Sequence, residues 1–174
     1  TTVPATTTCT DPTKWAVSYW DNVTLTGDPV DEVCEGAVGR NWGLGGPAKT
    51  DVDYFSGRWT KTVNFAPGSY EFTIGADDGV RMRIDGSLVY NRWVDKSYSD
   101  ETVVVSLGGN HVIEVEYYER ATDARLTMMW SDEPVCADDE PQWFGQYYNG
   151  TSLRGDRLKF ERYDVSPNFD WGKG

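Results

Sequence analysis

The chain has 174 residues, of which 39% are hydrophobic and 14% aromatic, enough for one folded domain or for one domain and part of another. Its 16 Lys and Arg face 28 Asp and Glu, and the formal net charge of -12 argues against nucleic acid and anionic lipid surfaces as partners. The sequence holds no apolar run of the length that a membrane-spanning helix needs, which argues against membrane insertion.

Residues 1–14 begin TTVPATTTCT, a threonine-rich composition typical of the extended linkers of exported proteins. This stretch has neither the basic start nor the apolar core of a signal peptide. We therefore expect residues 1–14 to be a linker and the protein to be extracellular, secreted or on a cell surface, with any export signal already removed.

An internal repeat organises the rest of the chain. The matching residues of the two copies, all at one constant offset, are Trp15, Tyr19, Leu25, Gly27 and Asp28 in the first and Trp143, Tyr147, Leu153, Gly155 and Asp156 in the second. The repeat predicts a complete unit over 15–132, a linker over 133–142, and the amino-terminal part of a second copy over 143–174. Because so short a fragment cannot bury its own aromatic face, we expect it to pair with another copy, another chain or the edge of the first unit.

Hydrophobic residues within the first unit alternate with polar ones, the period of a half-buried strand. The clearest runs are Tyr70, Phe72 and Ile74; Val80, Met82 and Ile84; Ile113, Val115 and Tyr117; and Leu126, Met128 and Trp130. Between them, glycine-containing pairs predict turns at Pro67-Gly68, Asp78-Gly79, Asp85-Gly86 and Gly108-Gly109. The expected fold class is all-β, an antiparallel β-sandwich or barrel.

The order and spacing of several short motifs resemble a known family. These motifs are Arg58-Trp59-Thr60, Pro67 to Phe72, Asp77 to Arg81, Ile84-Asp85-Gly86, Asn91-Arg92-Trp93, Leu107 to His111, Glu116 to Glu119 and Leu126 to Trp130. Together they resemble the domain family named for the fourteen-kilodalton amino-terminal piece of the anthrax protective antigen. The resemblance covers the first unit, and the stretch after Trp143 matches the start of the family pattern again. It implies a lectin-like β-barrel or sandwich whose members often bind carbohydrate, some of them through calcium.

The adjacent carboxylates Asp77 and Asp78 are the first candidate site. In sugar-binding members of the family the matching aspartates are joined by a cis peptide bond and ligate calcium, which takes hydroxyls of the sugar. A hard dication that prefers oxygen ligands also offsets the repulsion between neighbouring carboxylates. The remaining ligands are expected from the loop holding Thr122 and Asp123, where relatives often carry an asparagine; Asp123 is the third predicted metal ligand. The alternative is an Asp-Gly turn with Asp77 capping the bend.

Further ligand contacts are predicted at Arg92, Trp93 and Asp95, because an aromatic face with flanking charges suits a pyranose. The alternative for Trp93 is a place in the core or at the mouth of the barrel, and a core place is also expected for Trp42 and Trp59. Arg81 and Arg83 are interpreted as a solvated strand face.

Three cysteines, Cys9, Cys34 and Cys136, leave two pairings open, Cys9 with Cys34 or Cys34 with Cys136. His111, the single histidine, is expected in an exposed turn rather than as a general base. With no GxSxG elbow present, we expect a non-catalytic carbohydrate-binding module in a tandem array, assisted by calcium. The rival reading is a structural spacer or protein-interaction domain.

Overall fold

The computed structural model describes residues 9–131 and the strand segments 143–148 and 158–164. The described residues form strands and no helix. The strands are β1 (Trp15–Trp20), β2 (Asp31–Glu35), β3 (Gly39–Gly43), β4 (Phe55–Asp77), β5 (Gly79–Ile84), β6 (Ser87–Arg92), β7 (Ser99–Glu119), β8 (Ala124–Trp130), β9 (Trp143–Tyr148) and β10 (Leu158–Asp164). The expected all-β fold is confirmed. Because no described residue lies in a helix, none of them belongs to a helix that could span a membrane.

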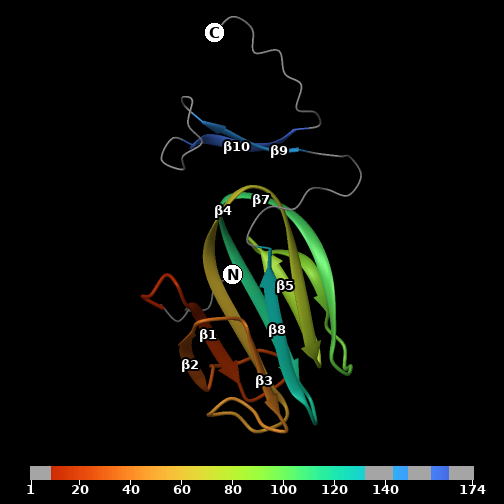
Figure 1. The fold of residues 1–174 in the computed structure, drawn as a ribbon. Helices are drawn as coiled ribbons and strands as arrows, with labels where there is room; N and C mark the ends of the chain where they lie inside the picture. The colour runs from red at the N-terminus through yellow and green to blue at the C-terminus, as the bar shows by residue number, and fades with distance from the viewer. Residues whose placement is uncertain (1–8, 132–142, 149–157, 165–174) are drawn as a thin grey trace, which may run out of the picture.

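The first eight strands form one antiparallel sheet that folds over on itself into a sandwich (Figure 1). One layer has the order β2-β1-β4-β7-β5-β6, and β3 and β8 extend the sheet from the second half of β4. The first half of β4 pairs with β1, whereas residues 72–77 of the same strand pair with β8. The two longest strands, β4 and β7, pair with each other along nearly their whole length and therefore belong to both layers.

The core lies between the layers. It is filled by the hydrophobic residues that the predicted alternation places on the inner faces of the strands. Phe72 and Ile74 of β4, Val80 and Met82 of β5 and Val115 of β7 are fully buried, as the period of two requires. Trp59 is also fully buried, which confirms its expected core position. Trp42 is half-buried, packs against the core and stacks on Tyr117 with ring centroids 5.8 Å apart.

Two of the predicted turns are wrong, because Pro67-Gly68 and Gly108-Gly109 lie inside β4 and β7. Phe65 pairs with Gly109 and Gly68 with Leu107, so two residues of β4 oppose one of β7 in a β-bulge. Proline has no amide hydrogen to give to a ladder, and the unpaired position of a bulge accepts it. The bulge lets both strands bend where the sheet passes from one layer to the other (Figure 1). The predicted Asp85-Gly86 turn is confirmed, with positive φ at both residues.

His111 lies within β7, beside this bulge, and not in a turn. Its imidazole is partly buried, and Nδ1 lies 2.6 Å from Oδ2 of Asp85. The other carboxylate oxygen of Asp85 accepts a hydrogen bond from the amide of Val112 at 2.8 Å. The histidine thus ties the β5–β6 turn to β7.

A disulfide joins Cys9 to Cys34 in β2, with 5.7 Å between their Cα atoms. This selects one of the two pairings that the sequence left open, and Cys136 lies outside the described residues. The backbone carbonyl of Thr13 also accepts a hydrogen bond from Nζ of Lys61 at 2.7 Å. The last residues of the predicted linker are therefore attached to the domain.

The strands β9 and β10 pair with each other in a separate antiparallel sheet. β9 starts at Trp143, which matches Trp15 at the start of β1, and β10 corresponds in the same way to β2. The two strands thus match β1 and β2 in position, and the truncated second copy stays a prediction. The remainder of the predicted second copy lies outside the described residues, so its expected partner stays a prediction.

Candidate functional site

Three carboxylates meet where β4 ends and β7 ends. Asp77 closes β4, Asp78 links it to β5, and Glu119 is the last residue of β7. One carboxylate oxygen from each of the three lies within 4.8 Å of the other two. The peptide bond between Asp77 and Asp78 is cis, the conformation that the resemblance implied. The two vicinal side chains therefore do not diverge but share one locus with a third acid.

Backbone amides from two loops fix the aspartates. Tyr98 donates its amide hydrogen to Oδ2 of Asp77 at 3.0 Å. Lys96 and Arg120 donate theirs to Oδ1 and Oδ2 of Asp78, each at 2.9 Å. Residues 93–98 and 120–123 therefore fold around the carboxylates and orient them, and Asp78 is left only 7% exposed.

Burial makes negative charge costly at this locus. Desolvation raises the pKa of Asp77, and the charges of Asp78 and Asp123 add to the effect. Glu119 is fully buried, and desolvation together with the charge of Asp78 raises its pKa to about 8. Such shifts mark groups whose ionised forms lack a compensating cation.

The nearest ammonium group is turned partly to other acceptors. Nζ of Lys96 donates to the carbonyl oxygen of Ala76 and lies 3.3 Å from the carbonyl oxygen and 3.2 Å from Oγ of Ser99. Desolvation lowers the pKa of Lys96, while the charge of Asp77 acts in the opposite direction. The partly buried ammonium of Lys96 therefore interacts with the charges of Asp77 and Asp78.

One oxygen of Glu119 lacks a hydrogen-bond partner in the described part of the chain. Oε2 of Glu119 lies 3.0 Å from the hydroxyl of Tyr117, which also donates to the carbonyl oxygen of Asp77. Oε1 of Glu119 is buried without a hydrogen-bond partner, one of two such side-chain atoms among the described residues. Buried polar atoms are nearly always paired. Three carboxylates with an unpaired oxygen are a donor set that fits Ca²⁺, which prefers oxygen ligands.

The structure brings Glu119, rather than Asp123, into this group. Asp123 is exposed in the loop between β7 and β8, and its charge reaches Asp77 without its carboxylate being one of the three. Thr122 is exposed in the same loop, with a φ of 84°, and its amide donates to Oδ1 of Asp53 at 3.0 Å.

Asp95 and Trp93 belong to the loop whose amides bind the aspartates, and their side chains contact residues outside the group of three carboxylates. Asp95 accepts a hydrogen bond from the hydroxyl of Tyr118 at 2.6 Å and pairs with Nε of Arg120 at 2.9 Å. The Trp93 ring contacts Tyr118 edge-on, at 4.8 Å between centroids, and the guanidinium of Arg81 lies 4.2 Å from its centre. Trp93 is half-buried, has a cation over its ring, and is not one of the residues that form the core.

Arg92, the remaining predicted contact, is exposed at the end of β6. Its Nε donates to Oε1 of Glu101 at 2.8 Å, and this ion pair is open to solvent. Among the contacts described, none joins Arg92 to the carboxylates of the site.

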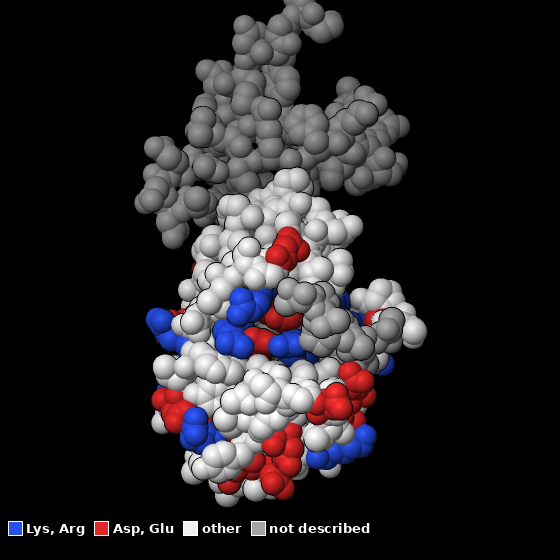
Figure 2. Space-filling model, turned by 180° about the vertical axis from the view of Figure 1, so that it is seen from behind, with Lys and Arg blue, Asp and Glu red and all other residues white. Residues whose placement is uncertain are grey.

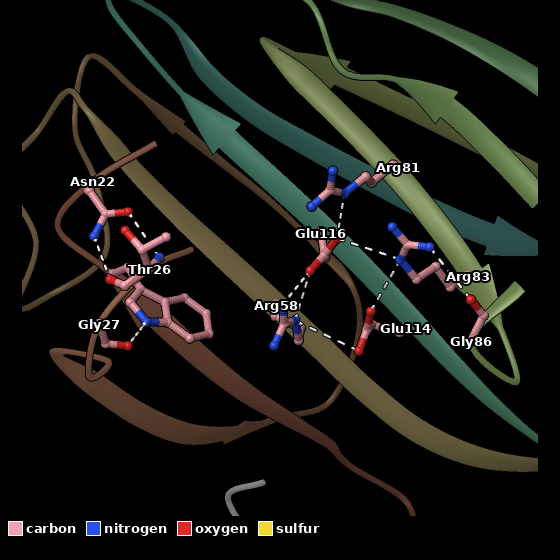
Figure 3. A network of polar contacts seen from close by, with 10 residues as sticks. Asn22, Thr26, Gly27, Arg58, Arg81, Arg83, Gly86, Glu114 and Glu116 are labelled. Atoms are coloured by element: carbon pink, nitrogen blue, oxygen red, sulfur yellow. Dashed lines mark hydrogen bonds and ion pairs between the residues drawn. The ribbon is translucent and has the colours of Figure 1, made fainter. Parts of the chain in front are cut away.

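Arg81 and Arg83, predicted to form a solvated face that offsets the acidic surface, are partly exposed, at 28% and 31% of their side chains, and they pair there with acidic residues. Arg81 and Arg58 both bond to Glu116, whose side chain is only 3% exposed, and Arg83 lies between Glu114 and Glu116 at 3.7 and 3.9 Å (Figure 3). Arg58 comes from β4, the glutamates from β7 and the other arginines from β5, so neighbouring strands place them in one row. Figure 2 shows the rear surface of the domain, where cationic side chains gather around acidic ones.

Glu119 was missed, although the sequence carried a signal for it. It follows Ile113, Val115 and Tyr117 in the same alternation and therefore falls on the buried side of its strand. A charged residue at an inward-facing position is rarely left without a partner or a function.

Comparisons with known proteins agree with the fold. The family model of the PA14 domain matches residues 12–141. The chain is 30% identical over 154 residues to the anti-sigma-I factor RsgI3 of Acetivibrio thermocellus, covering 76% of this chain and 24% of that protein. A solved structure of an anti-sigma factor domain-containing protein superimposes with a TM-score of 0.64 at 25% identity, covering 92% of this chain and 61% of that one.

A further solved structure is the PA14 sugar-binding domain from an RTX adhesin. It superimposes with a TM-score of 0.55 at 16% identity and covers 70% of this chain and 90% of that chain, a likeness of fold. The anti-sigma-I factor is much longer than the chain, so the match concerns one part of that protein. With the family model matching most of the residues and the sandwich matching in topology, the chain belongs to the PA14 domain family.

Proposed function

We propose that this domain is a non-catalytic carbohydrate-binding module that takes a glycan through a calcium ion held by Asp77, Asp78 and Glu119. The observation that carries the proposal is the meeting of the three carboxylates, one of which, Glu119, has an oxygen without a hydrogen-bond partner among the residues that the structure describes. Calcium takes about six to eight oxygens, so three side chains leave positions for other oxygens. Sugar hydroxyls are suitable ligands, and the loops 93–98 and 120–123 stand around the site to select among them.

Family membership supports the same reading. The RTX adhesin domain of the same fold is named as sugar-binding, and an oxygen-rich site on exposed loops is what such a domain needs. A single site of this kind would bind with a Kd on the order of 1 mM. Repetition of the module would raise the overall affinity through effective concentration, which gives the second copy a purpose.

The relatives also suggest a setting. Because this chain spans 24% of RsgI3, we propose that the domain is one module of a larger protein of the anti-sigma factor class. The Cys9–Cys34 disulfide supports an oxidising, extracellular environment. In that setting glycan binding would be the sensory input of the larger protein.

Calcium comes first in the experiment that tests this function. Thermal unfolding of the domain is followed in EDTA, in CaCl₂ and in MgCl₂, for the wild type and for Asp77→Asn. Asparagine keeps an oxygen for the Tyr98 amide but removes the charge. Asp28→Asn, an exposed acid in the β1–β2 connection, is the matched control. Calcium should raise the midpoint of the wild type and of the control and leave Asp77→Asn nearly unchanged.

Glycans are then tested on the calcium form. Methyl glycosides and a panel of polysaccharides are titrated with and without EDTA, and binding should require calcium. A midpoint that neither calcium nor any glycan moves would favour the structural spacer. Stabilisation by calcium alone would leave a metal-supported interaction domain.

A further inference from the structure

A sugar ring has apolar faces as well as hydroxyls, and the three carboxylates can serve only the hydroxyls. The chain from 44 to 54, between β3 and β4, exposes three large hydrophobic side chains, Leu44 at 77%, Val52 at 55% and Tyr54 at 56%. Val94, on the loop that holds the aspartates, is 54% exposed. Single exposed hydrophobic residues are ordinary, but here they gather on loops that adjoin an acidic site.

Tyr54 is the member of this group that the strand pairing places beside the site. Phe55 of β4 pairs with Glu119 of β7. Because the strands are antiparallel, Tyr54 and Arg120 lie opposite each other at the next position along them. The amide of Arg120 donates to Asp78 at 2.9 Å. Tyr54 therefore lies opposite the residue whose amide binds Asp78, and one position before the residue that pairs with Glu119.

Neighbouring contacts hold this segment in place. Oδ1 of Asp53 accepts the amide of Thr122 at 3.0 Å, joining the loop before β4 to the loop after β7. On the other side, Phe55 is fully buried with its ring 5.9 Å from that of Tyr117. The residues on both sides of Tyr54 are therefore anchored to the rest of the domain.

The backbone of Tyr54 is unusual for such a residue. Its φ is 61°, in the left-handed region that glycine and asparagine adopt readily and bulky aromatic residues rarely do. A side chain that packed into the core could compensate for that conformation, but Tyr54 is 56% exposed. Residues with such strained backbones cluster at ligand sites, where the strain is part of how the site is pre-organised.

We infer that Tyr54 is the stacking platform of the glycan site, receiving the apolar face of the pyranose whose hydroxyls reach the cation. The inference rests on the proposed function and assigns to Tyr54 the aromatic role that the sequence suggested for Trp93. The Trp93 ring is occupied by Arg81 and Tyr118, at 4.2 and 4.8 Å, whereas Tyr54 is open to solvent. The expected ligand is a pyranoside with one face free of axial hydroxyls, and that face would stack on the exposed ring of Tyr54.

Three variants of Tyr54 test the platform, with methyl glycosides of glucose, galactose, mannose and xylose as probes and saturating CaCl₂. Tyr54→Phe keeps the ring and should bind within about threefold of the wild type. Tyr54→Ala should weaken the best probe about tenfold or more, the scale of one lost aromatic contact. Tyr54→Gly removes the ring yet suits a positive φ, so its thermal midpoint should hold or rise while its affinity falls.

Met129→Ala, at an exposed residue of β8, is the control for loss of surface hydrophobicity. Calcium affinity, measured without sugar, should be the same in all variants. Wild-type sugar affinity in Tyr54→Ala would overturn the inference and leave the proposed function standing. A wild type that binds calcium but none of the four probes would overturn both.

Discussion

Glu119→Gln replaces one carboxylate oxygen of a fully buried side chain with an amide nitrogen, so the side chain can no longer ionise. In the folded protein the pKa of Glu119 is about 8, against 4.5 for an ordinary glutamate. Between those values the folded chain retains a proton that the unfolded chain has released. The stability contributed by the neutral carboxyl is therefore fully present below pH 4.5 and is lost as the pH rises towards 8.

The size of the effect follows from the interval. A difference of one pKa unit corresponds to about 1.4 kcal/mol, so the wild type should lose roughly 3 kcal/mol relative to Glu119→Gln between pH 5 and pH 8. Glutamine stays neutral throughout and still offers an oxygen within reach of the Tyr117 hydroxyl. Urea unfolding in EDTA at half-unit pH steps measures the difference, with the exposed Glu101→Gln as control.

Calcium should largely abolish this pH dependence, because a cation favours the ionised carboxylate. In CaCl₂ the wild type should be nearly as stable at pH 8 as at pH 6, while Glu119→Gln should gain little from the ion. Parallel pH curves for wild type and variant in EDTA would refute the reasoning, since they would mean that Glu119 is ionised and compensated in the fold.

Three further outcomes are expected. Cys34→Ser should lower the free energy of unfolding by about 3 kcal/mol, the scale for a closed loop of this length, and reduction of the wild type should match it in urea titrations. Gly79→Ala would place a Cβ 2.1 Å from an aromatic ring, so it should cost about 3 kcal/mol and weaken calcium binding, whereas Gly36→Ala, which meets nothing within 4 Å, should be neutral in the same assays. Glu116→Gln strands two arginines and should cost about 2 kcal/mol by urea unfolding, against less than about 1 kcal/mol for Glu101→Gln.

Strand positions were predictable because one face of each strand is buried, and alternation records that fact directly. Val80 and Met82 point inward as their pattern requires. Pro67 and Gly68 were misread because proline and glycine mark a bulge as readily as a turn, and only the pairing with β7 tells the two apart. The sequence correctly indicated a bend at this position. It did not show that the bent segment stays paired with β7.

The candidate site was predictable in part. Vicinal aspartates are conspicuous in a sequence, whereas Glu119 reaches them from a strand end some forty positions away only because β5 and β7 pair beside the β4 terminus. The partner of Arg81 was likewise not predictable, because this partly exposed arginine contacts Glu116 on a neighbouring strand. Contacts between strands depend on register, and register is a property of the whole fold.

The continuity of β4 and β7 through both layers has a consequence for how the domain comes apart. Since neither layer has a boundary of its own, opening one would strip partners from the other, and the sandwich should lose its amide protection as a single cooperative unit. Hydrogen exchange at Trp59 and at Ile74, which sit at opposite ends of β4 with different neighbours, should therefore report the same opening energy. A domain built this way should resist force applied to its ends and then unfold in a single cooperative step.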